Sequence, residues 1–379
     1  MDGRVLGTTT IPSTRTDVLD RNMLNVTECL YRRTTDFDAI ALTLYITKVY
    51  MMPVLALLGF IGNSLSFVVL TKEMRSTPTA FLLKALAVAD NAVLTVYLCF
   101  FSISCVYEYT GHFLPYKKYF EMTKSYSWAL LWFTKVISVY LVVAVTVERF
   151  IAVCRPHKAR TWCKIKNART AVGCICMFSL IYNLPKCFSW ETALRYDPCL
   201  EETVPIGIDT ALGKNQYFNT FYKVILYIMT VFIIPLTTIL ALNYQLIKAI
   251  TVGGHRGNLR KRRHTNYDAI TKRVVAVCGV FLILELPAVL MNILEIIAYI
   301  DGQVKGYQPL YLVSETTNGL IHLAYTFSAL NSCVNFYIYF LTGNQFRRTL
   351  KWMLLGHSNG MDKSAPNNHT LETGVSVHR

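Results

Sequence analysis

The stretch VVAVCGVFLILELPAVLMNIL, residues 274–294, decides the fold, because it is long and apolar enough to cross a lipid bilayer as one helix. About 20 apolar residues span the roughly 30 Å of hydrocarbon in a bilayer. Glu285 is the one charged residue in this stretch. A carboxylate at that depth costs about 2.5 to 3.5 kcal/mol, so it needs a partner inside the protein.

Six further stretches have the same apolar character. The chain has 379 residues, of which 53% are hydrophobic and 16% are charged, and its mean hydropathy is +0.35. That composition is too apolar for an ordinary soluble domain. Apolar stretches with few or no charges lie at residues 49–70, 85–107, 125–147, 170–184, 224–247 and 319–346. We therefore predict an all-α fold, a seven-transmembrane helix bundle, in which Pro185 and Lys186 interrupt the fourth span.

Basic residues are concentrated on one side of the predicted bundle. The net charge is +15, and its densest clusters lie at residues 155–169, 255–264 and 347–351. If the spans alternate in direction, all three clusters lie on the same face, and the positive-inside rule makes that face cytoplasmic. We therefore expect a multi-pass protein of the plasma membrane with its N-terminus outside and its C-terminus in the cytoplasm. This distribution argues against a nucleic-acid partner.

The predicted bundle divides the chain into four parts. They are an extracellular N-terminal tail at 1–44, the seven-span bundle at 45–342, an amphipathic helix at 343–355 and a disordered cytoplasmic tail at 356–379. The start of the chain is polar, so we expect no cleavable signal peptide. Asn25 in the triplet NVT is expected to be glycosylated outside the cell.

The segment after the seventh span predicts a short helix on the inner leaflet of the bilayer. Phe346, Leu350, Met353 and Leu354 share one helical face, and neighbouring arginine and lysine side chains can meet anionic headgroups. We expect this apolar face to lie in the membrane surface.

Three charged residues stand out inside predicted spans: Asp90, Lys135 and Glu285. Each helical residue rises about 1.5 Å, so depth can be counted from the inner end of a span. Lys135 precedes Arg149 by fourteen residues, roughly 21 Å. Glu285 follows Arg273 by twelve residues, roughly 18 Å. The matching depths favour a direct ion pair, with two alternatives left open: a protonated, hydrogen-bonded Glu285, or two groups that face a wet cavity and bind ligand separately.

Short motifs occur in the order and in the spans typical of one receptor family. They are GN at 62–63, LAVAD ending at Asp90, ERF at 148–150, Pro235 in FIIPL, Phe281 six residues before Pro287, and NSCVNFYIY at 331–339. Together with seven predicted spans, they make residues 45–355 resemble the rhodopsin-like (class A) G-protein-coupled receptors. The resemblance implies a receptor that transmits agonist binding to a heterotrimeric G protein, with arrestin and a receptor kinase as further partners.

Three departures from the common pattern are similar to the FMRFamide and myosuppressin neuropeptide receptor branch. NFYIY stands where Asn-Pro-x-x-Tyr is usual, ERF carries Phe150 in place of Tyr, and YNLPK follows a fourth span without a central tryptophan. This resemblance implies an extracellular peptide ligand, a short amidated peptide of the Arg-Phe-amide type.

The resemblance also implies a set of site residues by aligned position. The implied ligand-binding residues are Trp132, Lys135, Glu285, Asn292, Glu295, His322 and Tyr325. The residues implied for activation and G-protein coupling are Glu148, Arg149, Pro235, Phe281 and Tyr339. Glu285 stands where most of the family has a tryptophan that repacks on activation, so an electrostatic switch would replace an aromatic one. The alternative is an ion pair that only fixes helix register.

A sodium pocket is a second implication of the same resemblance. The aligned residues are Asp90, Ser138, Asn331, Ser332 and Asn335. One carboxylate and several neutral oxygens suit a hard cation such as sodium. The alternative is a water-filled hydrogen-bond network among the same groups. We expect no cofactor besides this internal sodium ion.

The family's usual disulfide between the third helix and the second outer loop is missing here. Lys124 aligns with the usual cysteine, and no cysteine occurs from 106 to 153. Cys105 could pair with Cys187 or Cys199 instead, and pairing with Cys29 is a further alternative; the sequence does not choose between them.

Three other kinds of function compete with a peptide receptor. A class A receptor for a small aromatic or lipid ligand is disfavoured by the long outer loops at 106–122 and 187–218. A seven-span transporter would use the buried charges as a translocation path, but it predicts inverted repeats or broken helices that the sequence does not show. An enzyme is the least favoured class, because the sequence shows no HExxH, Walker or GxSxG motif and no metal-spaced Cys/His cluster.

Overall fold

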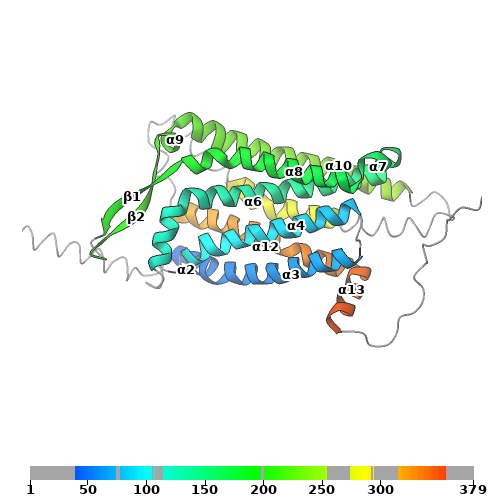
Figure 1. Ribbon diagram of the computed structural model, residues 1–379, viewed down its shortest axis with the longest axis horizontal. Helices are drawn as coiled ribbons and strands as arrows, with labels where there is room; N and C mark the ends of the chain where they lie inside the picture. The colour runs from blue at the N-terminus through cyan, green and yellow to red at the C-terminus, as the bar shows by residue number, and fades with distance from the viewer. Residues whose placement is uncertain are drawn as a thin grey trace, which may run out of the picture.

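The computed structural model describes residues 39–73, 77–104, 106, 114–197, 200–253, 274–291, 293 and 315–355. Within these residues, long helices lie side by side along the long axis of the molecule (Figure 1).

The helices and strands follow in the order expected of seven spans. The first span contains α2 (Ala39–Tyr45), η1 (Ile46–Met51) and α3 (Met52–Glu73), and the second contains α4 (Pro78–Val96) and η2 (Tyr97–Ile103). The third is α6 (Leu114–Cys154), followed by α7 (Pro156–Trp162). The fourth contains α8 (Ile165–Asn183) and η3 (Leu184–Phe188), followed by β1 (Trp190–Asp197), β2 (Glu202–Asp209) and α9 (Ala211–Lys214). The fifth contains η4 (Phe218–Leu226), η5 (Ile228–Ile233) and α10 (Ile234–Gly253).

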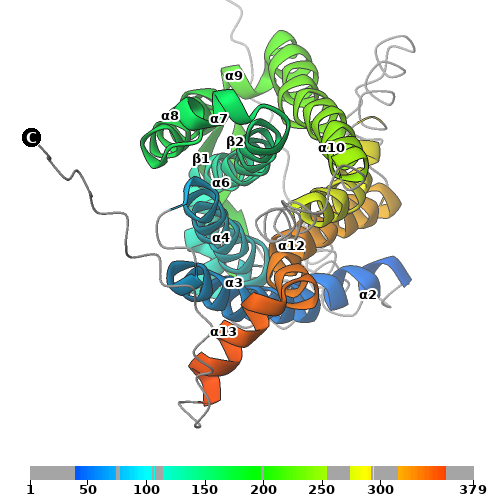
Figure 2. The ribbon, with the colours of Figure 1, turned by 90° about the vertical axis from the view of Figure 1, so that its right-hand side faces the viewer.

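The sixth span is the helix Val274–Met291, and the chain continues with α12 (Glu315–Thr342) and α13 (Asn344–Leu355). Among the described residues, six helices are long and apolar enough to cross a membrane: Leu42–Lys72, Pro78–Phe100, Leu114–Cys154, Ile165–Phe188, Phe218–Ala249 and Val274–Met291. α12, with 28 residues, is roughly 42 Å long and supplies the seventh helix. Viewed along the axis, α3, α4, α6, α10 and α12 surround a common interior (Figure 2). The predicted all-α seven-helix bundle is confirmed.

Local sequence signals set the bounds of several helices, and the end of the bundle that carries α7 and α13 is called the inner end below. The Thr77 side chain caps α4 by accepting a hydrogen bond of 3.2 Å from the backbone N–H of Ala80, and Pro78 takes the first helical position. Pro156 starts α7 in the same way after α6 has ended. In the fifth span, π-helical turns run up to Ile233, and Pro235 follows at the start of α10, where its missing N–H interrupts the regular ladder.

Close approach between α3 and α12 depends on the GN motif. A Cβ atom on Gly62 would lie 2.8 Å from the Cβ of Phe336, so no larger residue fits there without movement. The next side chain, Asn63, donates a hydrogen bond of 3.0 Å from Nδ2 to the backbone oxygen of Ser332. This pair of residues therefore fixes the first helix against the seventh.

The apolar core contains an outer cluster, around Leu94, Leu131 and Ala329, and a larger inner cluster, which also includes Tyr182 and Tyr227 of the outer half. Along α6, Leu131 belongs to the outer cluster and Val136 to the inner one, with Lys135 between them. Along α4, Val93 and Ala89 belong to the outer and inner clusters respectively, on either side of Asp90. Lys135 and Asp90 thus each lie where the two clusters meet along their own helix.

The outer end of the bundle carries structure that the sequence analysis missed. α6 has 41 residues, roughly 62 Å, so it extends well beyond the hydrocarbon and replaces much of the predicted loop 106–122. β1 and β2 form an antiparallel hairpin within the predicted loop 187–218. The hairpin packs on the extension of α6, where the Lys118 ammonium lies 2.7 Å from the Glu202 carboxylate. Figure 1 shows the hairpin at the opposite end of the bundle from α7 and α13.

The predicted helix after the seventh span is present as α13, but its apolar face is used differently. Phe346 and Leu350 are buried in the inner core, and the Phe346 ring lies 5.9 Å from that of Phe336. Leu354 is 65% exposed. The expectation that all four apolar residues face the membrane is therefore wrong for the first two, because the helix turns back onto α3 and α12 and buries its first turns there.

Candidate functional site

Lys135 and Glu285 form a buried ion pair at the centre of the bundle. The Lys135 Nζ of α6 lies 2.9 Å from Oε2 and 3.1 Å from Oε1 of Glu285 on the sixth helix. Each residue is only 5% exposed. The two side chains lie in direct contact, as the depth count favoured, and not as separate groups that face a wet cavity.

Two groups of α12 complete the coordination of this pair. Lys135 also donates a hydrogen bond to the Ser328 hydroxyl, and Asn331 donates one of 3.2 Å from Nδ2 to Oε1 of Glu285. The pair thus joins the third, sixth and seventh helices. A buried ion pair repays its desolvation cost only when further hydrogen bonds satisfy its remaining atoms, and these two bonds do so.

Asp90 is the centre of a second polar group closer to the inner end of the bundle. The Ser138 hydroxyl donates to Oδ1 of Asp90 and the Asn335 amide donates to Oδ2, each at 2.7 Å. Of the residues predicted to hold sodium, Asn331 instead donates to Glu285. Ser332 is buried beside the group. The carboxylate and hydroxyl oxygens of this group suit a hard cation as ligands. In this arrangement each carboxylate oxygen of Asp90 already accepts a hydrogen bond.

A small cavity lies between the two polar groups. Its volume is about 10 Å³, close to the space that one water molecule needs. It is lined by Val93, Lys135, Ser138, Val139, Glu285, Ser328, Asn331 and Ser332. Because residues of both groups line it, the ion pair and the Asp90 group are parts of one polar core.

Arg149, at the inner end of α6, is held by two neighbours. Its Nε and Nη2 atoms donate to the two carboxylate oxygens of Glu148 at 2.7 Å and 2.9 Å. It also donates to the hydroxyl of Thr79 on α4, which in turn donates to Oε2 of Glu148 at 2.8 Å. Arg149 and Glu148 are buried. This closed triangle shows Arg149 in a restrained position, facing α4.

Other contacts close the inner end around this triangle. The Thr146 hydroxyl lies 3.1 Å from the Cys278 thiol and connects α6 to the sixth helix. The Cys163 thiol donates to the backbone oxygen of Glu148 at 3.7 Å, and burial raises the pKa of this thiol, which keeps the donor proton on sulfur. The predicted activation residues Phe281 and Tyr339 are buried in the inner core, and Pro235 lies near the start of α10.

The outer half above the ion pair is lined by aromatic rings. Trp132 meets Tyr227 edge-on with ring centroids 4.7 Å apart. Tyr325 lies 6.3 Å from Trp128 and 5.8 Å from the imidazole of His322. The structure therefore brings Trp132, His322 and Tyr325 to the outer side of the Lys135–Glu285 pair. Asn292 and Glu295, predicted to join them, lie outside the described residues.

Sequence reasoning missed several members of these groups. They are Thr79, Trp128, Thr146, Tyr227, Cys278 and Ser328. Trp128 lies seven residues, two helical turns, before Lys135, so helical spacing could have found it. Thr79, Thr146, Cys278 and Ser328 carry no such signal, because threonine, serine and cysteine are common in apolar spans. Tyr227 lies on a different helix from its partner Trp132, so helical spacing does not relate the two.

One of the cysteines predicted for a disulfide, Cys187, lies among the described residues, and it carries a free thiol in this structure. Cys105 and Cys199 lie outside the described residues, as does the glycosylation candidate Asn25. Lys124, which stands at the usual cysteine position, lies 4.5 Å above the Trp190 ring of β1 and 3.4 Å from the Glu121 carboxylate. A cation contact thus joins the third helix to the second outer loop here.

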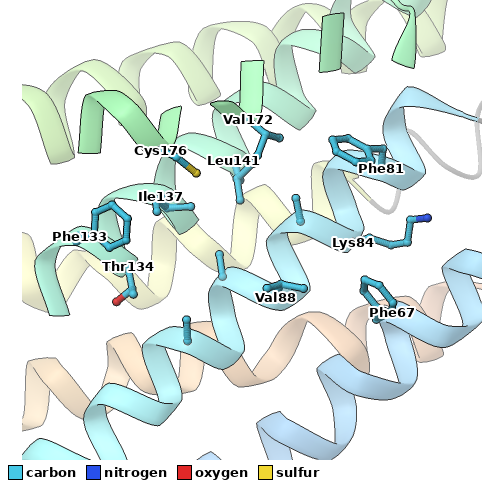
Figure 3. Close-up of a pocket in the computed structure, with 13 residues that line it drawn as sticks. Phe67, Phe81, Lys84, Val88, Phe133, Thr134, Ile137, Leu141, Val172 and Cys176 are labelled. Carbon is cyan, nitrogen blue, oxygen red and sulfur yellow. The ribbon is translucent and has the colours of Figure 1, made fainter. Parts of the chain in front are cut away.

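A larger cavity lies elsewhere, between α4, α6 and α8. Its volume is about 420 Å³, and Figure 3 shows Phe81, Val88 and Ile137 facing it. Lys84 supplies its one charged lining group. No predicted ligand-binding residue lines this cavity, so it is separate from the polar core.

Comparison with known proteins agrees with this arrangement. The family model described as 7 transmembrane receptor (rhodopsin family) matches residues 62–339, more than half of the chain. The chain belongs to this family. Its members are membrane receptors and not enzymes, so the receptor is a multi-pass membrane protein.

The receptor is similar to several curated peptide receptors. It is 25% identical over 329 residues to the FMRFamide receptor of Drosophila melanogaster, covering 86% of this chain and 56% of that protein. It is 27% identical over 345 residues to an FMRFamide peptide receptor of Caenorhabditis elegans, covering 86% and 76%. It is 27% identical over 329 residues to the sex peptide receptor of Drosophila melanogaster, covering 81% and 72%. The chain thus spans little more than half the length of the first of these relatives.

Charge exchange tests the energetic role of the ion pair. Lys135→Glu and Glu285→Lys should each lower stability by about 3–5 kcal/mol, because each leaves like charges buried together. The double exchange should recover most of that loss. The measurement is thermal stability in detergent together with surface expression. Breaking the outer pair with Lys118→Gln is the matched control and should cost about 0–1 kcal/mol. A double exchange no better than the single variants would contradict the role assigned to the pair.

Removal of the Thr79 hydroxyl tests the restraint on Arg149. Thr79→Val should raise basal G-protein signalling by roughly 5- to 10-fold, because the resting state loses a buried hydrogen bond worth about 1–1.5 kcal/mol. The measurement is ligand-free signalling normalised to surface expression. Thr71→Val is the control, since its hydroxyl bonds only to Phe67 of its own helix. Unchanged basal signalling in Thr79→Val would show that the triangle does not restrain Arg149.

Proposed function

We propose that this receptor binds an extracellular neuropeptide, a short amidated peptide of the Arg-Phe-amide type, and passes agonist binding to a heterotrimeric G protein. The observation that carries the proposal is the buried Lys135–Glu285 pair beneath aromatic rings of the outer half. The similarity to receptors named for FMRFamide and sex peptide supports a peptide as the ligand.

The chemistry of the pair suits a peptide that ends in Arg-Phe-amide. A guanidinium presents a planar set of N–H donors that fits a carboxylate better than an ammonium does. The arginine of the peptide therefore competes with Lys135 for Glu285. The terminal phenylalanine packs against the rings of Trp132, Tyr227 and Tyr325, where an aromatic pair contributes about 0.5–1.5 kcal/mol beyond its buried area.

Loss of the ion pair then weakens the contacts that hold the sixth helix. Glu285 is held to α6 through Lys135 and to α12 through Asn331. When the ligand takes Glu285, both connections weaken and the sixth helix is free to move. Its inner end then separates from α6 at the Thr146–Cys278 contact, and Arg149 leaves Glu148 and Thr79 to face the G protein. Phe281 and Pro235 repack in this step, and Tyr339 supports the open form.

The proposal includes an orientation and further partners. The N-terminus with Asn25 lies outside the cell, and the basic end with α7 and α13 lies in the cytoplasm. The concentration of basic residues at 155–169 and 347–351 supports this orientation. Hydroxyl residues in the C-terminal tail make a receptor kinase and arrestin suitable partners at the same end.

An internal sodium ion is part of the resting state in this proposal. Asp90 and Ser138 would hold it, with Asn331, Ser332 and Asn335 around them. The buried carboxylate and hydroxyl oxygens of this group support the assignment.

A screen of amidated neuropeptides tests the proposed function. Cells that express the full chain should respond to Arg-Phe-amide peptides through at least one G-protein sensor. Glu285→Gln should raise the effective concentration at least about 10-fold, because a charged hydrogen bond is worth about 1.5–3 kcal/mol. Glu191→Gln changes an exposed acid of β1 and should leave potency unchanged. A response to small aromatic or lipid agonists alone would contradict a peptide ligand.

Dependence of agonist affinity on sodium tests the proposed ion. Raising sodium at constant ionic strength should lower agonist affinity of the wild type several-fold, because the ion favours the resting state. Asp90→Asn should abolish that dependence. If sodium does not change the agonist affinity of the wild type, the Asp90 group holds a hydrogen-bond network and not a sodium ion.

A further inference from the structure

Lys186 is a further buried cation, and its surroundings differ from those of Lys135. It lies in η3, after α8, and is only 9% exposed. Its Nζ lies 4.7 Å from the ring centre of Trp132, 5.4 Å from that of Tyr227 and 5.7 Å from that of Tyr182. Its hydrogen bond of 3.0 Å goes to the neutral side-chain oxygen of Asn183.

No carboxylate among the described residues pairs with this ammonium. Glu121 pairs with Lys117 at 3.2 Å, and Glu202 pairs with Lys118 at 2.7 Å. A second cation, Lys223, is close enough to act on Lys186 electrostatically. Burial of an ammonium without a counter-ion is unfavourable, and ring faces and one amide oxygen offset only part of that cost.

The position of Lys186 is fixed by the backbone around it. The Ser125 hydroxyl of α6 donates to the backbone oxygens of Lys186 and Cys187 at 3.1 Å and 2.7 Å. The Ser189 hydroxyl donates to the same Lys186 oxygen at 2.8 Å. These bonds fix the backbone of η3 against the third helix. The Lys186 side chain therefore starts from a fixed point beside Trp132.

Lys186 shares a wall with the proposed ligand site. Trp132 precedes Lys135 by three residues, so its ring starts about 4.5 Å further out along α6. Trp132 and Tyr227 contact each other and both contact Lys186. Glu285 of this site can thus bind a cation. About one helical turn further out, Lys186 can bind an anion.

We propose that Lys186 binds an acidic group of the ligand, the carboxylate of an aspartate or glutamate side chain. This inference rests on the proposed peptide function and adds a charge requirement to it. An amidated terminus has no carboxylate, so the anion must come from a side chain upstream of the arginine. A sulfated tyrosine offers the same charge from a different source. The ligand therefore carries a cation for Glu285 and an anion for Lys186.

Matched peptides and charge variants test this inference. The probes are synthetic amidated peptides ending in Arg-Phe-amide, in sets with Asp, Asn, Lys or sulfotyrosine at each upstream position in turn. At one position, the Asp peptide should be at least about 10-fold more potent than the Asn peptide on the wild type. Lys186→Gln should abolish that preference, Lys186→Arg should keep it, and Lys186→Glu should favour the Lys peptide.

Lys118→Gln is the matched control, because it removes an outer cation that already has an acidic partner. It should leave the preference for Asp unchanged. Surface expression of each variant is measured in the same cells. An Asp preference that persists in Lys186→Gln would overturn the inference and leave Lys186 as a structural cation. A preference for sulfotyrosine over Asp that is lost in Lys186→Gln would support the anion site with a sulfate as its occupant.

A second measurement separates this inference from the proposed function. If no Arg-Phe-amide peptide activates the wild type, the peptide proposal fails, and the anion site is tested without an agonist. The probes are then N-acetyl-aspartate amide and its asparagine analogue, added to the purified full-length receptor during thermal unfolding. Stabilisation by the aspartate probe that is absent in Lys186→Gln supports the site. Equal unfolding temperatures with both probes would overturn it.

Discussion

The constraint on which this structure depends is that a charge inside the bilayer must find its counter-charge within the protein. Lys135 and Glu285 are 150 residues apart in sequence, and they meet this requirement across two helices. Removal of either charge leaves the other unpaired in an apolar interior, which costs several kcal/mol. The third and sixth helices are therefore held together at the level of the pair, and Ser328 and Asn331 bring the seventh helix to the same point.

This arrangement makes the pair suitable as a switch. A ligand can shift an equilibrium only through a difference in its affinity for the two states. A competing cation at Glu285 provides such a difference, because it binds well only when Lys135 has released the carboxylate. The small cavity and the Asp90 group continue the polar core towards Arg149, where a second set of hydrogen bonds holds the resting form. Two electrostatic restraints at different depths thus act on the same helices.

Fixed helical geometry explains which features the sequence could predict. The rise per residue placed Lys135 and Glu285 at one depth, and the structure pairs them. The family resemblance assigned Asn331 to the Asp90 group, whereas in the structure its amide donates to Glu285. Thr79 gave no signal, since its partner Arg149 lies 70 positions away in the chain. The outer extension of α6 and the β1–β2 hairpin mix polar residues with exposed apolar ones, such as Met122 and Leu194, so they carry no strong apolar period. Lys186 was read as an interruption of a span, whereas its burial among rings depends on side-chain packing that no spacing rule gives.

The charge state of Glu285 in the resting receptor tests the central claim most directly. Isotope-edited infrared spectroscopy of the purified receptor, with Glu285→Gln as the reference, separates an ionised carboxylate from a protonated acid. The ion pair predicts a carboxylate band that Glu285→Gln removes, and no acid carbonyl band assigned to this residue. A carbonyl band of a protonated acid that disappears in Glu285→Gln would contradict the ion pair, and with it the electrostatic switch.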